Sequence, residues 1–124
     1  FDSYRDYMNA VNDELVILPM IETVESLEAI DEIAAIEGVD VLLVGPSDLS
    51  INLDVTLDYR HPKYIEALER VGAAAKRADI LAGMYFVPPG LTPKELIELG
   101  FGFFTIPWQR SAKEGVKEAL QKIR

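Results

Sequence analysis

One apolar stretch, residues 39–50, constrains the fold of this chain more than any other. It reads VDVLLVGPSDLS, an aliphatic and β-branched run that stops abruptly at Gly45. Such a run is typical of a strand buried on both faces, as in a parallel sheet that helices cover. We therefore expect a central parallel strand whose carboxyl end carries Gly45, Pro46, Ser47 and Asp48.

A second apolar run precedes it. Residues 15–21 read LVILPMI, and the next residue is an acid, Glu22. Pro19 lacks an amide donor, so we expect an irregularity or an edge position there. Glu22 and Asp48 thus mark the ends of two successive strands. Because ligands gather at the carboxyl ends of parallel strands, the pair is a candidate site for one hard divalent cation or for acid/base chemistry.

The rest of the chain repeats the strand-helix pattern. Thr23 predicts the start of a helix with apolar residues at helical spacing, which Gly38 ends. After the central strand, a long connection over residues 49–60 leads to a helix that opens at His61-Pro62. Strands are predicted at residues 80–87 and 101–106. Capping boxes at Thr92/Glu95 and Ser111/Glu114 predict the two helices that follow, the last with these residues facing inward: Val116, Ala119, Leu120 and Ile123. Residues 2–12 are predicted to form a short leading helix.

Four strand-helix units in a row predict an α/β fold with right-handed crossovers. A closed parallel barrel needs eight units, so we expect residues 1–124 to be a single domain equal to the second half of a (β/α)8 TIM barrel. An open flavodoxin-type sheet is the competing fold, but no Gly-rich phosphate loop follows the first strand. Half a barrel leaves two strand edges bare, which the missing half, another copy or a rearrangement must cover. The start at Phe1 suggests a processed or truncated chain.

Composition limits the partners. The 124 residues carry a net charge of -9, which argues against nucleic acid and anionic membrane surfaces as partners. No apolar run approaches the roughly 20 residues needed to cross a bilayer. The chain has no cysteine, which excludes disulfides and thiolate chemistry and is consistent with a cytoplasmic location.

Three short motifs carry a family resemblance. They are IET at residues 21–23, EGVD at residues 37–40 and GPSDLS at residues 45–50, with His61-Pro62 opening a helix further on. In their mutual spacing they resemble the HpcH/HpaI aldolase and citrate-lyase family, in particular its 2-keto-3-deoxy acid and 2,4-dihydroxyheptenedioate aldolase branch. The likeness covers nearly the whole chain.

The resemblance implies a class II aldolase that cleaves a 4-hydroxy-2-oxo acid to pyruvate and an aldehyde. It assigns Glu22 and Asp48 as ligands of Mg²⁺ or Mn²⁺, with Co²⁺ or Zn²⁺ as further options, and the ion as a Lewis acid. The segment Gly45, Pro46, Ser47 and Asp48 would bind the substrate carboxylate through backbone amides. A small 2-oxo acid is the implied partner, and the uncovered sheet predicts a homo-oligomer.

Two departures from the family keep other interpretations open. The arginine and the His-Asp pair that family members use lie in the first barrel half, which this sequence does not contain. Met20 stands where many members carry Gln. The alternatives are a catalytically inactive barrel fragment and a non-catalytic binder of metal and 2-oxo acid.

Five other residues have both a functional and a structural interpretation. His61 is either catalytic or a helix-entry residue, and the sequence favours the second. Trp108 and Gln109 line a pocket mouth, or Trp108 closes the barrel end. Arg60 and Arg110 attract an anionic substrate, or are ordinary loop arginines. Without the resemblance, Glu22 is a first-turn helix acid and Asp48 a turn cap.

Overall fold

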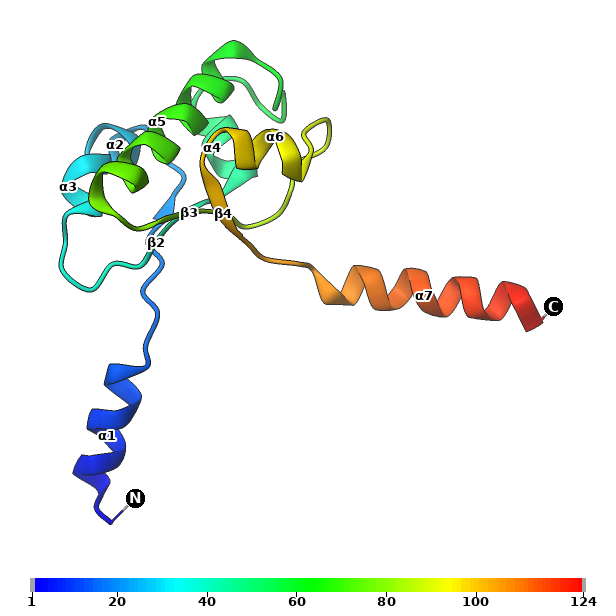
Figure 1. Ribbon diagram of the computed structural model, residues 1–124. Helices are drawn as coiled ribbons and strands as arrows, with labels where there is room; N and C mark the ends of the chain where they lie inside the picture. Colours follow the sequence, from blue (N-terminus) through cyan, green and yellow to red (C-terminus); the bar gives the residue numbers. More distant parts are fainter. Residues whose placement is uncertain (1, 124) are drawn as a thin grey trace.

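The computed structural model describes residues 2–123 and shows a parallel sheet with helices between its strands (Figure 1). The four strands are β1 (Met20–Ile21), β2 (Val41–Val44), β3 (Leu81–Met84) and β4 (Phe101–Phe104). The helices are α1 (Tyr4–Asp13), α2 (Val24–Glu28), α3 (Ile30–Ala34), α4 (Pro46–Asn52), α5 (Pro62–Ala78), α6 (Pro93–Glu98) and α7 (Trp108–Ile123). The strand order is β1-β2-β3-β4, and every pairing is parallel. This confirms the predicted series of four βα units.

The predicted central strand is β2. All four of its residues are buried, and it pairs with β1 on one side and with β3 on the other. A strand without polar alternation fits this position because neither of its faces meets water. The strand ends at Val44. Residues 45–48, here called the GPSD segment, follow immediately.

The core lies on one face of the sheet, beneath α5. This helix packs against β2, β3, α2 and α3, and α6 packs against β4. Figure 1 shows α2, α3, α5 and α6 on the same side of the strands. The buried cluster combines strand and helix residues, including Ile21, Leu42, Val44, Met84, Tyr64, Leu68 and Val71.

The strands β1, β3 and β4 are shorter than predicted. The run at residues 15–21 contributes only Met20–Ile21 as a strand, together with an isolated bridge between Ile17 and Val39. Pro19 precedes the strand and β1 is an edge strand, so the irregularity and the edge position expected from this proline are both present. β3 and β4 likewise end before residues 87 and 106, and a register shift interrupts their pairing at Ala82/Gly83.

Two helical predictions need correction. The helix expected after Thr23 is divided at Ala29 into α2 and α3, although Thr23 caps it as predicted, in a capping box with Ser26. The connection at residues 49–60 is not all loop, because α4 occupies Pro46–Asn52. Pro46 is the first residue of α4, where a missing amide costs no hydrogen bond. The GPSD segment is therefore a helix N-terminus rather than a turn.

The last helix is also different from the prediction. α7 begins at Trp108, which places Ser111 inside the helix, and Glu114 pairs with Arg110 at 3.1 Å instead of closing a capping box. The residues expected to face inward, Val116, Ala119, Leu120 and Ile123, are exposed. Figure 1 shows α1 and α7 extending away from the sheet, and neither contains a buried residue. An amphipathic helix needs an apolar partner to bury its stripe, and neither helix has one within residues 2–123.

The second face of the sheet is apolar and lies opposite the covering helices. Gly83 belongs to this face, and a Cβ atom built there would lie within 3.2 Å of side-chain atoms of Val41, Leu43 and Phe103. Leu81 is on the same face and is 49% exposed. None of the described helices is both long enough and apolar enough to cross a membrane.

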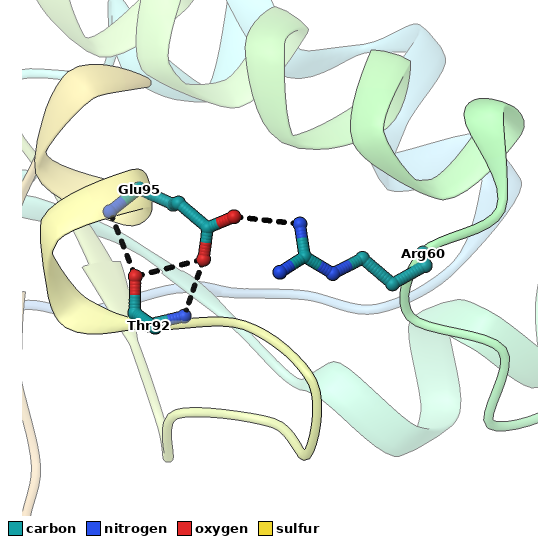
Figure 2. A network of polar contacts seen from close by, with 3 residues as sticks. All are labelled: Arg60, Thr92 and Glu95. Carbon is teal, nitrogen blue, oxygen red and sulfur yellow. Dashed lines mark hydrogen bonds and ion pairs between the residues drawn. The ribbon is translucent and has the colours of Figure 1, made fainter.

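Figure 2 shows the contact that joins the loop before α5 to the start of α6. Glu95 closes the predicted capping box, because its Oε2 accepts hydrogen bonds from the amide and hydroxyl of Thr92 at 2.8 and 2.7 Å. Its other oxygen accepts from Arg60 Nη1 at 2.6 Å. The hydrogen bond from Arg60, followed by those from Thr92, lowers the pKa of Glu95 from 4.5 to about 2.

We predict that Arg60→Gln raises the pKa of Glu95 toward 4.5, measured by NMR titration of its side-chain carboxyl carbon. Because the pKa is lower in the folded than in the unfolded chain, this contact stabilises the fold above about pH 4.5 and is lost as the pH falls toward 2. Arg77→Gln is the matched control, since Arg77 pairs with Asp31 instead. An unchanged Glu95 titration in Arg60→Gln would contradict the assignment.

Candidate functional site

Glu22 lies at the carboxyl end of β1. It directly precedes Thr23, the N-cap of α2, so it is not a first-turn acid; Glu25 has that position. The Glu22 amide donates to Ser26 Oγ at 3.3 Å, and its side chain is partly buried. The interpretation of Glu22 as a helix-dipole acid therefore fails, because the residue lies before the helix.

Gly45 leaves room for the Glu22 carboxylate. A Cβ atom built on Gly45 would lie 2.6 Å from Glu22 Oε2 and 3.1 Å from Met20 Sδ. The Gly45 amide also donates to the Ile21 carbonyl oxygen at 3.2 Å. Glu22 thus packs directly against the start of the GPSD segment, and only glycine fits at residue 45 without displacing the carboxylate.

Asp48 lies in the first turn of α4. Gly45 is the N-cap of this helix, and Pro46 and Gly45 are buried whereas Asp48 is exposed. No hydrogen bond to the amides of Ser47 and Asp48 is found among the described residues, which is usual for the first amides of a helix. The arrangement leaves two donors at the end of β2 next to a carboxylate.

One side chain that the sequence did not single out joins the two segments. Asn52 Nδ2 donates to the Glu22 carbonyl oxygen and to the Asp48 carbonyl oxygen, both at 3.0 Å. The bond to Asp48 joins residues four apart, a spacing that can be recognised in the sequence of a helix. The bond to Glu22 joins residues 30 apart. No local sequence pattern predicts a contact between residues so far apart in the chain.

The donor set suits a hard cation. Neither carboxylate, of Glu22 or of Asp48, has a hydrogen bond or ion pair with another described residue. No cluster of three or more His, Cys, Asp or Glu side chains suited to a metal occurs within residues 2–123. Mg²⁺ is commonly bound by one or two carboxylates while it keeps several waters, whereas catalytic Zn²⁺ usually has three protein ligands. The two acids therefore fit Mg²⁺ or Mn²⁺ better than Zn²⁺.

Ser47 is in contact with an aromatic pair behind the segment. Its Oγ lies 3.3 Å from the Tyr59 hydroxyl oxygen, and the rings of Tyr59 and Tyr64 meet edge to face at 5.4 Å. Burial, and then the neighbouring Tyr59, raise the pKa of Tyr64, whose hydroxyl has no hydrogen-bond partner among the described residues. Tyr64 therefore remains neutral, and its ring packs on Tyr59, whose hydroxyl contacts Ser47 in α4.

The remaining candidates lie elsewhere. His61 is the N-cap of α5, and its Nδ1 accepts from the Lys63 amide at 3.2 Å, as the structural interpretation predicts. Arg60 and Arg110 pair with Glu95 and Glu114, so their charges are already compensated.

Trp108 and Gln109 line an open cleft of about 690 Å³ together with Tyr85, Phe86, Val87, Thr105, Ile106, Pro107 and Arg110. Neither Glu22 nor Asp48 belongs to that lining.

Known proteins share this sequence and fold. The chain is 32% identical over 124 residues to a hydroxypyruvate/pyruvate aldolase of Paraburkholderia phytofirmans, covering 97% of this chain and 46% of the relative. It is 30% identical over 115 residues to a 4-hydroxy-2-oxo-heptane-1,7-dioate aldolase of Shigella sonnei, covering 93% and 44%. A solved HpcH/HpaI aldolase/citrate lyase family protein of Burkholderia cenocepacia superposes with a TM-score of 0.80 at 30% identity, over all of this chain and 48% of that protein.

These matches also define what the chain covers. It spans about half the length of the curated relatives it matches, and its four βα units superpose on about half of a family structure. The sequence profile of the HpcH/HpaI aldolase/citrate lyase family matches residues 3–106, which include Glu22, the GPSD segment and Asn52. The chain therefore belongs to the HpcH/HpaI aldolase/citrate lyase family.

Proposed function

We propose that the protein containing this chain is a divalent-metal-dependent aldolase that cleaves a 4-hydroxy-2-oxo acid to pyruvate and an aldehyde. The observation that carries the proposal is the packing of Glu22 against Gly45 at adjacent strand ends, with Asn52 joining Glu22 to Asp48. Family membership and the two aldolase relatives support the reaction class. The cytoplasmic location expected from the sequence stays a prediction.

Glu22 and Asp48 are the proposed metal ligands, and Mg²⁺ or Mn²⁺ is the proposed ion. A bound ion supplies a Lewis acid that polarises the 2-oxo group of the substrate. The chain's own part is to hold two hard oxygen ligands at fixed positions. Gly45 provides space beside Glu22, and the α4 backbone carries Asp48.

The substrate carboxylate is proposed to bind at the GPSD segment. Ser47 and Asp48 lie in the first turn of α4, where amides have no partner within the helix, so they can donate to an anion. The contact between Ser47 Oγ and the Tyr59 hydroxyl restrains the Ser47 side chain. Orientation by backbone amides adds no positive side chain, so the ligand's charge is balanced mainly by the ion.

A second candidate is a protein that binds metal and 2-oxo acid without cleaving a carbon-carbon bond. His61 favours it, because the chain's single histidine caps a helix through Nδ1 and lies outside the candidate site. Exchange of pyruvate methyl protons with solvent separates the candidates. An aldolase catalyses the exchange, whereas a binder shows affinity for pyruvate without it.

Self-association is proposed for the second face of the sheet. This face is apolar: Val41 and Leu43 are buried in it, Leu81 is 49% exposed and Phe103 is half-buried. An exposed apolar surface is typical of an interface. Both edges of the sheet are also unpaired among the described residues. A second copy would cover the face, and the exposed apolar residues on α7, Trp108, Val116, Leu120 and Ile123, add further apolar area.

The metal assignment predicts that Glu22→Ala and Asp48→Ala each weaken Mn²⁺ binding by at least about 100-fold, beyond the loss typical of residues outside the ligand set. The physical reason is the loss of one of two carboxylate ligands with no other donor to replace it. Calorimetric titration measures the affinity, and circular dichroism checks the fold. Glu25→Ala, an exposed acid on neighbouring α2, is the control and should bind normally. Normal affinity in either ligand variant would contradict the assignment.

The mechanism predicts no imine between pyruvate and the protein. Every lysine of this chain lies in a helix and none in a strand: Lys63, Lys76, Lys94, Lys113, Lys117 and Lys122. An imine-forming aldolase needs an activated lysine beside the reacting carbonyl. Borohydride reduction in the presence of pyruvate should therefore give no covalent adduct, and excess EDTA should abolish cleavage. An adduct, or full activity in EDTA, would overturn the metal mechanism.

The association proposal predicts that Leu81→Lys shifts the protein toward monomer in light scattering, because a charge on the second face opposes its burial. Ile51→Lys is the matched control, since Ile51 is equally exposed at 49% but lies on α4. A wild-type protein that stays monomeric at every concentration tested would refute self-association.

A further inference from the structure

Asn52 holds a position that the proposed reaction does not by itself explain. It is the last residue of α4, and its single amide nitrogen donates to two carbonyl oxygens, those of Glu22 and Asp48. Both distances are 3.0 Å, so the two oxygens lie no more than twice that distance apart. An amide NH₂ group has two hydrogens, and both are used here.

Few other contacts fix Glu22 relative to α4. β1 contains only two residues, and the backbone bond from Gly45 to Ile21 ends its pairing with the central strand. The Glu22 amide donates to Ser26 Oγ, in α2, and not to a residue of α4. Among the described residues, Asn52 makes the side-chain hydrogen bond that joins Glu22 to α4. Without it, the backbone of Glu22 depends on a short edge strand.

α4 itself is well anchored. Ser50 is fully buried, and its Oγ donates to the Ser47 carbonyl oxygen at 2.7 Å and accepts from the Leu57 amide at 3.0 Å. The first bond lies within α4, and the second ties the helix to the loop that follows it. A fixed helix gives Asn52 a rigid base, so its side chain transfers the position of α4 to Glu22.

We propose that Asn52 is a positioning residue that sets the separation of Glu22 and Asp48 and thereby the affinity for a divalent cation. The proposal rests on the proposed function, in which these two acids are the ligands. Residues that orient metal ligands through hydrogen bonds commonly change affinity 10- to 100-fold when they are replaced. Asn52 acts on the ligand backbones, so its loss should weaken binding without removing a ligand.

The test compares Asn52→Leu, which is similar in size but has no donor, with Asn52→Gln, which keeps two donors on a longer arm. Ile51→Ala is the control on the same helix, because Ile51 is half exposed and makes no side-chain contact of this kind. Two quantities are measured on the protein: the carbonyl ¹³C shifts of Glu22 and Asp48 without metal, and Mn²⁺ affinity by electron paramagnetic resonance.

We expect Asn52→Leu to move both carbonyl shifts and to weaken Mn²⁺ binding about tenfold, with a smaller loss in Asn52→Gln and none in Ile51→Ala. Wild-type affinity in Asn52→Leu, or an equal loss in Ile51→Ala, overturns the positioning role. Unmoved carbonyl shifts in metal-free Asn52→Leu overturn it independently of any metal. Failure of the wild-type protein to bind Mn²⁺ overturns the proposed function and the metal role of Asn52, and the metal-free shifts then show whether the contact itself also fails.

Discussion

The structure depends on the burial of β2 between two parallel neighbours. Its hydrogen bonds to β1 and β3 fix the sheet, and its side chains Leu42 and Val44 enter the core beneath α5. Parallel pairing also forces successive strands to end at the same edge. The position of Glu22 beside the GPSD segment follows from that geometry, because both come directly after paired strands.

The two faces of the sheet differ in a way that matters for function. One face is covered by α2, α3, α5 and α6, while the other presents Leu81 and Phe103 without a covering helix (Figure 1). In a complete (β/α)8 barrel, the second face is packed inside the barrel. The half-length match to the relatives fits this arrangement, since four βα units supply only one half of such a wall.

The candidate site is organised by backbone contacts rather than by ion pairs. Gly45 leaves room for the Glu22 carboxylate beside the GPSD segment, Asn52 joins α4 to Glu22, and Ser50 joins α4 to Leu57 in the following loop. The salt bridges lie elsewhere on exposed surfaces, such as that of Arg60 and Glu95 in Figure 2. This leaves the carboxylates of Glu22 and Asp48 free of competing cationic side chains, which is what a ligand pair requires.

The sequence determined the features that short-range chemistry controls. The apolar run of β2, the caps at Thr23, His61 and Thr92, and the interruption at Pro19 all depend on neighbouring residues, and each was predictable. α4 was missed although Pro46 at its first position is a helix-start signal, because the GPSD residues also fit a turn.

Tertiary structure decided the rest. The apolar stripe of α7 was visible in the sequence, but its burial depends on a partner, and the described chain offers none. Asn52 has no local signal for its bond to Glu22, since the contact exists only after β1 and β2 pair. Sequence thus fixes which segments become strands and capped helices, while contacts between distant residues form only when parallel pairing brings the strand ends together.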